Sequence, residues 1–334
     1  MGLGSYAVGV TTRTFVDSTR KTPANGTEPE HPDRTLNTEI WYPVAGDSGP
    51  DATVRDEPPV GGPWPLVLFV HSSSGTRVGY EYLTAGLAHA GFVVAAADFP
   101  LTSARTPGGP SDLHVTDEVG DLSFLCDSLT AAAAATGDLL HGAVDGSHYG
   151  VVGHSTGGTV AMLAAFAGDD AAVKHDARVS AVVPLSGDAC MFDAPFFKKR
   201  SVPIMIVGGT DDLFVRLPNN GQWAFDNSGA PHLPAKLVGG QHLFFTEFMF
   251  DDELVGPTPT VSTSPLATTL SAYGSGAECD PTPPGGTDPK MPFDTQHDLT
   301  VKLVTAYFDA QLRSHPEVLA GLLTDANPLI VFQQ

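Results

Sequence analysis

A serine flanked by glycines is the residue in this chain best suited to nucleophilic chemistry. Residues 148–158 read HYGVVGHSTGG, so strand-forming residues lead directly into a Gly-x-Ser-x-Gly pattern centred on Ser155. A turn of this kind between a strand and a helix is so tight that the serine needs neighbours with almost no side chain, and the turn exposes the hydroxyl. The Ala-rich stretch 159–167 has the composition of a helix, and Gly168 stops it. This context predicts a nucleophilic Ser155, with the backbone N–H of Thr156 facing a developing oxyanion.

A serine nucleophile needs a general base, and His242 is the candidate. It follows a short apolar strand, 236–238, which breaks on two glycines. Side chains that follow the strands of a parallel sheet gather at its carboxyl edge. His242 also lies downstream of the candidate acids, and the order serine, acid, histidine is one of the known chain orders of a catalytic triad. We therefore expect His242 to take and return the proton.

Three aspartates compete for the role of the acid that orients the base. Asp212 follows the buried strand 201–210 and precedes two apolar residues that could shield it from water. Asp188 ends the preceding strand, 179–185, and is the serious competitor. Asp211 is expected to be a solvated turn residue. Loop geometry favours Asp212, but the sequence leaves Asp188 open as an alternative.

The second oxyanion donor is expected after an earlier strand. Residues 65–70 form an apolar strand that runs into the polar loop 71–75, and the backbone N–H of Ser73 is the most plausible donor. Tyr80, Tyr82 and Phe214 lie close in sequence to these loops and are expected to line the acyl or alcohol pocket, with the core of a helix as the equal alternative for Tyr82.

The elements that must position these residues alternate between strand and helix from about 65 to 238. This pattern predicts a mainly parallel sheet with helices on both faces. Two edge strands, 6–16 and 36–42, are expected before it, and a final amphipathic helix, 295–312, after it. We expect residues 1–334 to form a single domain, since a chain of this length is compatible with one core plus insertions.

A long segment and three cysteines fall outside this pattern. Residues 251–292 are rich in Pro, Gly, Ser and Thr, and we expect this loop insertion to form a partial lid or wall over the pocket. Cys126 fits the buried face of a helix. Cys190 and Cys279 remain as one potential disulfide, which the sequence alone does not decide.

Together these motifs resemble the α/β-hydrolase family. Within it, the chain is similar to dienelactone-hydrolase-like and platelet-activating-factor-acetylhydrolase-like esterases. The resemblance covers most of the chain and rests on EIWYP at 39–43, FVH at 69–71, AGFVVA at 90–95 and GHSTGG at 153–158. It implies an α/β-hydrolase fold and an ester hydrolase that needs no cofactor or metal.

Two departures from these families refine the expectation. Ser72 stands where they usually have glycine after the histidine, which implies a differently shaped oxyanion loop. Dienelactone hydrolases proper resemble cysteine enzymes, whereas Ser155 stands at the nucleophile position here, which favours a carboxylesterase. The acetylhydrolase resemblance supports Asp188 as the acid, while cutinase-type polyester hydrolases place the acid where Asp212 stands.

Composition limits the partners. The chain has 334 residues, 42% of them hydrophobic, and 17 basic against 38 acidic residues give a net charge of −21. Such a charge argues against nucleic acid and anionic membranes as partners and favours a neutral ester substrate. No apolar run approaches the length of a membrane span, and no signal peptide is visible. We expect a cytoplasmic protein or a mature secreted form, of undetermined oligomeric state.

The function expected from the sequence is that of a serine carboxylesterase acting through an acyl-enzyme. The alternatives are a cutinase-type hydrolase of polyesters or aromatic diesters and, in a different class, a binding protein on a hydrolase scaffold that has lost catalysis.

Overall fold

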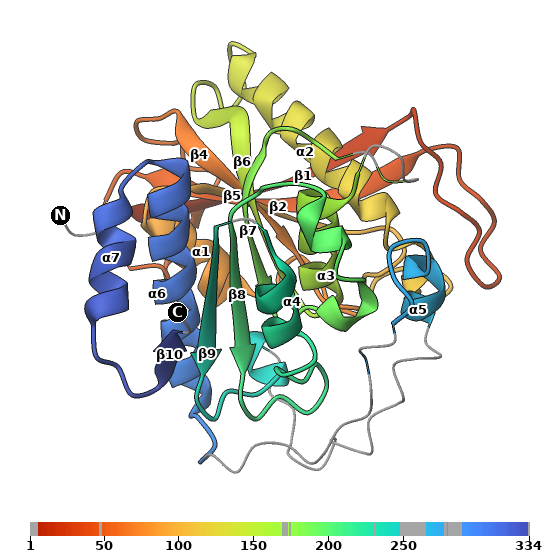
Figure 1. Cartoon of the computed structure of the whole chain (residues 1–334). Helices are drawn as coiled ribbons and strands as arrows, with labels where there is room; N and C mark the ends of the chain where they lie inside the picture. Colours follow the sequence, from red (N-terminus) through yellow and green to blue (C-terminus); the bar gives the residue numbers. More distant parts are fainter. Residues whose placement is uncertain are drawn as a thin grey trace.

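The computed structural model describes residues 6–46, 49–168, 173, 175–229, 231–247, 265–276, 279 and 289–332. In this part of the chain ten strands form one sheet, in the order β10-β9-β8-β7-β6-β4-β5-β2-β1-β3 (Figure 1). The strands are β1 (Ala7–Asp17), β2 (Arg34–Val44), β3 (Thr53–Arg55), β4 (Trp64–Val70), β5 (Val93–Asp98), β6 (Val144–His154), β7 (Val179–Leu185), β8 (Ile204–Gly209), β9 (His232–Leu237) and β10 (Ile330–Phe332).

The strands β4 to β9 run parallel to one another, whereas β2 pairs antiparallel with β5 and β10 pairs antiparallel with β9. Parallel neighbours need crossover connections, which helices usually supply. The predicted mainly parallel sheet with helices on both faces is therefore confirmed. The expectation of two N-terminal edge strands was wrong, because β2 lies between β1 and β5, and β1 lies between β2 and β3. The edge is the three-residue β3, which is too short to show a strand periodicity.

Seven helices are described in these residues, with four short 3₁₀ turns between them. The helices are α1 (Glu81–His89), α2 (Asp117–Ala134), α3 (Thr156–Phe166), α4 (Gly221–Asn227), α5 (Pro265–Leu270), α6 (Phe293–Leu312) and α7 (Pro316–Thr324). The turns are η1 (Asp112–His114), η2 (Ala189–Met191), η3 (Phe196–Lys198) and η4 (Leu243–Phe245). The expected last helix is α6, but α7 and β10 follow it, so that expectation was wrong about the end of the chain. None of the helices described is long and apolar enough to span a bilayer.

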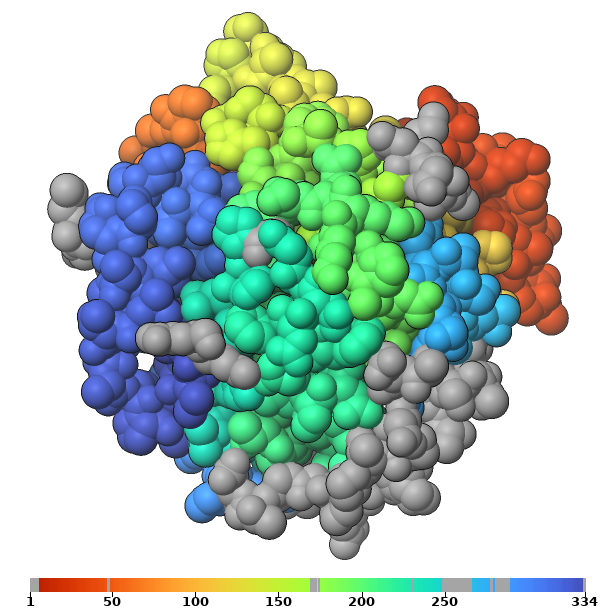
Figure 2. Space-filling view, in the orientation of Figure 1, coloured from red at the N-terminus to blue at the C-terminus, as the bar shows by residue number. Residues whose placement is uncertain are grey.

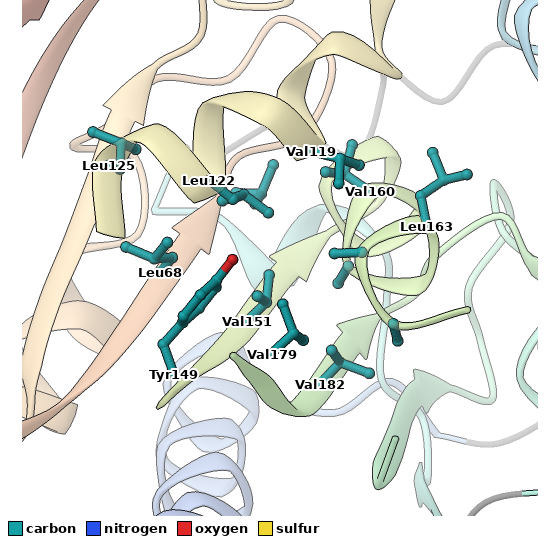
Figure 3. Packing of buried hydrophobic residues seen from close by; sticks show 14 of the residues in the cluster. Leu68, Val119, Leu122, Leu125, Tyr149, Val151, Val160, Leu163, Val179 and Val182 are labelled. Atoms are coloured by element: carbon teal, nitrogen blue, oxygen red, sulfur yellow. The ribbon is translucent and has the colours of Figure 1, made fainter. Parts of the chain in front are cut away.

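Each face of the sheet carries its own apolar core. On one face, Leu122 of α2 and Val160 of α3 pack with Leu68 of β4 (Figure 3). On the other, Leu303 of α6 packs with Val67 of the same strand. Because successive strand residues point to opposite faces, a central strand covered on both sides must be apolar throughout, as β4 is.

Buried ion pairs join the N-terminal hairpin, which consists of β1, β2 and the loop between them, to α2. Arg34 Nε donates to Asp121 Oδ1 at 2.8 Å, and Arg20 Nη2 donates to the same oxygen at 2.6 Å. The Asp121 side chain has no exposed surface, and that of Arg34 is 2% exposed. An unpaired carboxylate at such a depth would cost several kcal/mol. The arginines therefore hold the hairpin against the helix that covers this face.

Candidate active site

Ser155 lies in a sharp turn between β6 and α3. Its φ of 54° and ψ of −123° are rare for a residue with a side chain, a strain of order 1–3 kcal/mol that the surroundings must hold. A Cβ at Gly153 would lie 2.2 Å from the carbonyl oxygen of Gly157, and one at Gly157 would lie 2.2 Å from that of Val70. Only glycine fits at these two positions, which is the steric reason for the sequence pattern.

His242 connects Ser155 to Asp212. Its Nε2 lies 3.0 Å from Ser155 Oγ, and its Nδ1 lies 2.8 Å from Asp212 Oδ2. The second Asp212 oxygen accepts hydrogen bonds from the backbone N–H groups of Phe214, at 2.9 Å, and Val215, at 2.8 Å. The turn that begins at Asp212 thus fixes its carboxylate. A proton on Nδ1, shared with this carboxylate, leaves Nε2 free to accept the proton of the serine.

The surrounding groups favour a positive charge on His242. Burial lowers its pKa, but the charge and hydrogen bond of Asp212 and the charge of Asp188 outweigh this, so the pKa lies above its usual value. The ring of His154 is centred 4.6 Å from that of His242. Burial holds the pKa of His154 well below its usual value, so this neighbour is neutral and does not oppose an imidazolium.

Asp188 lies at the same edge of the sheet, after β7, but has different partners. Its backbone N–H donates to Thr159 Oγ1 at 2.9 Å, and that hydroxyl donates to Asp188 Oδ2 at 3.3 Å. Burial raises the pKa of Asp188 to about 6, against the opposing effects of His242 and Thr159. The structure brings Asp212 into hydrogen-bond contact with His242, whereas Asp188 acts on the imidazole through its charge. The backbone N–H of Asp211 donates to the carbonyl of Gly240 at 3.0 Å.

The predicted oxyanion donors belong to α3 and to the loop after β4. Thr156 is the first residue of α3, so its backbone N–H has no acceptor within the helix. The end of β4 touches the start of this helix, because Gly157 packs directly against the carbonyl of Val70. Ser73 follows in the loop, near Asp112, a carboxyl whose pKa is raised by burial against a lowering effect of the Ser73 side chain. The two segments that carry the predicted donors are therefore in contact.

Tyr80 forms polar contacts with both of these segments. Its hydroxyl donates to Ser72 Oγ at 2.9 Å, accepts from the backbone N–H of Ser72 at 3.2 Å and lies 3.0 Å from Nδ1 of His154. Ser72 precedes Ser73, and His154 precedes Ser155. The expectation that Tyr80 lines the pocket was wrong, because its side chain is fully buried. Sequence reasoning missed this bridge, and its only signal was a tyrosine near a polar loop.

The other aromatic residues near the site differ in their surroundings. The half-buried ring of Phe214 is centred 5.1 Å from that of His242, so Phe214 remains our prediction for a pocket wall. Tyr82, which sequence reasoning left between pocket wall and helix core, stacks on His297 at 3.6 Å. It also donates to the carbonyl of Phe245 at 3.1 Å.

A disulfide joins Cys190 of η2 to Cys279, 89 residues later, and so decides the pairing that the sequence left open. Cys126 is free and buried in α2, as its helical pattern predicts. The Thr269 hydroxyl donates to a backbone carbonyl of η1 at 2.9 Å. In Figure 2 the light blue residues around α5 lie against the green ones near η2. Most of the predicted lid, 251–292, lies outside the described residues, so the lid remains a prediction.

The doubly covered parallel sheet and the strained serine turn are the features of an α/β-hydrolase. Comparison with known families agrees, since the model described as "Dienelactone hydrolase family" matches residues 52–246. The chain belongs to the dienelactone hydrolase family, and it is a carboxylic ester hydrolase.

A solved structure supports the fold over nearly the whole chain. The chain is similar to a ferulic acid esterase from Streptomyces cinnamoneus, with a TM-score of 0.65 and 22% identity, over 98% of this chain and 97% of that one. The predicted α/β-hydrolase fold is thereby confirmed. The comparison with curated proteins gave no match.

Proposed function

We propose that this ester hydrolase is a serine carboxylesterase that cleaves neutral carboxylic esters through Ser155, His242 and Asp212. The observation that carries the proposal is the unbroken hydrogen-bond chain from the serine hydroxyl, through both imidazole nitrogens, to the carboxylate. Ser155 Oγ attacks the acyl carbon while His242 Nε2 takes its proton. Asp212 holds the ring in the productive tautomer and stabilises the imidazolium.

The reaction then passes through an acyl-enzyme. The backbone N–H groups of Thr156 and Ser73 are assigned to the oxyanion, where each donor contributes most when charge develops. The imidazolium of His242 returns its proton to the leaving alcohol. A water molecule then attacks the acyl carbon with His242 again as base, and the carboxylic acid is released from Ser155.

The substrate class is inferred from charge. With a net charge of −21, the protein disfavours anionic substrates and tends to expel the anionic acid product. Polyesters and aromatic diesters remain the second candidate, which requires an uncovered cleft. The similarity to a protein named as a ferulic acid esterase adds esters of ferulic acid to the substrates worth testing.

Initial rates on p-nitrophenyl esters from acetate to dodecanoate test the proposal, with methyl ferulate and a soluble aromatic diester alongside. The parent is compared with Ser155→Ala, Asp212→Asn and Asp188→Asn, and with Ser128→Ala, a serine in α2, as the matched control. A fluorophosphonate probe reports the nucleophile independently of the substrate chosen.

Short neutral esters should be cleaved by the parent and by the control, while Ser155→Ala should be silent and unlabelled. Asp212→Asn should lower kcat about 10⁴-fold because it favours the wrong tautomer of the base. Asp188→Asn should lower it less than tenfold. Labelling of Ser155→Ala would overturn the nucleophile, a larger loss in Asp188→Asn would move the acid to that residue, and a folded parent that neither cleaves nor labels would point to a binding scaffold.

A further inference from the structure

The first turn of α6 lies against the loop that carries His242. This loop runs from the end of β9 to the start of η4. Just before α6, the backbone N–H of Met291 donates to the carbonyl of Gly239 at 2.8 Å, and within the first turn of the helix Gln296 contacts the same loop. The loop of the base is therefore held by a part of the chain that lies beyond the stretch 52–246 matched by the family model.

The side chain of Gln296 forms two hydrogen bonds with the backbone of Gln241, the residue before His242. The Gln241 N–H donates to Gln296 Oε1 at 2.9 Å, and Gln296 Nε2 donates to the Gln241 carbonyl at 2.8 Å. A backbone N–H can only donate and a carbonyl can only accept, so the amide fits this backbone in one orientation alone. Because Gln296 has no exposed surface, water does not compete for either bond.

These two bonds fix the peptide groups on both sides of the Gln241 Cα. The Gln241 carbonyl belongs to the planar peptide group whose nitrogen is that of His242, so this plane ends at the Cα of His242. A rotation of the plane would move the imidazole away from both of its partners. Nε2 lies 3.0 Å from Ser155 Oγ, and Nδ1 lies 2.8 Å from Asp212 Oδ2. Hydrogen bonds weaken steeply when their geometry is lost, so small rotations matter here.

Gln296 is itself held in place by its helix. Its carbonyl accepts a hydrogen bond from Thr300 Oγ1 at 2.7 Å. The neighbouring His297 donates from Nε2 to the carbonyl of Thr246 at 3.2 Å. Two adjacent residues of one buried helical turn therefore contact the loop before and after His242.

The path of the loop does not depend on Gln296 alone. The Gly239 N–H donates to Thr210 Oγ1 at 2.8 Å, and the carbonyl of Gly240 accepts from the backbone of the same loop after β8 at 3.0 Å. These bonds remain when the Gln296 amide is removed, so the loop should keep its course. They precede Gln241, however, and do not hold the peptide plane that leads to the base.

We propose that Gln296 is a positioning residue for the general base. Its amide sets the orientation of His242 through the backbone of Gln241 and does not touch the reacting atoms. A base released from such a hold loses rate, because a displacement of about 1 Å costs on the order of 10²-fold. The inference rests on the function proposed above, in which His242 is the base.

Substitution of Gln296 in the full chain tests this role. Gln296→Met keeps the length of the side chain and removes both hydrogen bonds. Gln296→Asn, one methylene too short to form both bonds, serves if the first variant does not fold. Thr300→Val is the matched control, since it removes a buried hydrogen bond one turn later on the same helix. The readouts are kcat and KM on p-nitrophenyl acetate, the urea midpoint, and the low-field proton NMR signal of the His242 Nδ1–H.

In Gln296→Met, kcat should fall about 10- to 100-fold with KM nearly unchanged, because the base acts in the transition state. The Nδ1 proton signal should shift or broaden, since its hydrogen bond to Asp212 is displaced. Thr300→Val should keep the kcat and the proton signal of the parent, even where its urea midpoint falls as far.

The proposal is overturned if the folded Gln296 variant keeps the kcat or the proton signal of the parent, or if Thr300→Val loses as much kcat. A parent that neither cleaves esters nor reacts with the fluorophosphonate probe would instead refute the function proposed above. The NMR comparison of the variants would still report the position of His242 in that case.

Discussion

Replacing Tyr80 by phenylalanine should loosen the contact between the serine turn and the loop after β4. The substitution removes one oxygen from a fully buried ring, whose centre lies 4.5 Å from that of Phe69, so the packing of the ring is kept. The polar contacts to Ser72 Oγ, Ser72 N–H and His154 Nδ1 are lost together.

The size of the effect follows from the burial of the groups left behind. His154 is 1% exposed, so its unpaired nitrogen cannot reach water, and the full penalty of about 1–3 kcal/mol applies. Ser72 is half-buried, so water replaces part of what it loses, which leaves about 0.5–1 kcal/mol. The free energy of unfolding, measured in urea, should therefore fall by about 1.5–4 kcal/mol.

Activity should fall by a different route. A displacement of about 1 Å in a group that stabilises the transition state costs on the order of 10²-fold in rate. We expect kcat on a p-nitrophenyl ester to fall about 10- to 100-fold in Tyr80→Phe with KM nearly unchanged, the pattern of an interaction made in the transition state.

Tyr307→Phe is the matched control for this experiment. Tyr307 is 2% exposed, and its hydroxyl has no hydrogen-bond partner among the described residues, so loss of its oxygen breaks no bond. The reasoning is refuted if Tyr80→Phe is as stable as Tyr307→Phe and retains the kcat of the parent.

Three further substitutions test the charge of Asp188, the disulfide and the buried ion pair of Arg34. Asp188→Asn removes a negative charge that raises the pKa of His242, so the acid limb of the kcat/KM profile should move to lower pH, and an unmoved limb would contradict the coupling. Cys279→Ser opens a disulfide that closes 89 residues and should cost about 4–5 kcal/mol, measured under non-reducing conditions; equal stability of variant and parent would show that the bridge does not constrain the chain. Arg34→Met leaves its buried aspartate partner underpaired and should cost about 3–5 kcal/mol in urea unfolding. Lys21→Met, in a pair whose side chains are 66% and 53% exposed, should leave the free energy of unfolding nearly unchanged because water screens the pair, and similar losses in the two variants would refute the role of burial.

Much of the fold and of the candidate site could be predicted because local sterics determine them. A Cβ at Gly153 or Gly157 would lie 2.2 Å from a backbone oxygen, so only glycine fits at either position. The position of Ser155 can therefore be predicted from the Gly-x-Ser-x-Gly pattern and from the strand and helix that flank it. His242 could be placed because a strand that breaks on glycines delivers its next polar residue to the sheet edge.

The choice of acid could not be derived in the same way. Asp188 and Asp212 both follow parallel strands at one edge, and the loop pattern in the sequence favours Asp212 without excluding Asp188. What brings Asp212 to His242 is a turn in which one carboxylate oxygen accepts two backbone N–H groups, leaving the other for the imidazole. Such a turn is a property of the folded loop.

Short elements and long-range pairings were missed for related reasons. β3 and β10 have three residues each, fewer than any periodic pattern needs. Tyr80 was assigned to the pocket from its neighbours in sequence. Its hydroxyl instead contacts His154, which lies far along the chain and could not be linked to Tyr80 from the sequence. The predicted strand 236–238 corresponds to β9, His232–Leu237. This strand begins earlier than predicted, before the apolar residues that indicated it.

The sheet order has a consequence for any attempt to shorten this protein. A version cut to residues 52–246 would strip β2 from β5 and leave a long row of unpaired backbone groups on an apolar strand, an invitation to aggregation. It would also remove α6 from its core and both arginines from Asp121. The N-terminal hairpin and the C-terminal helix are remote from the serine turn in sequence, but they complete the sheet and the core on which that turn is built.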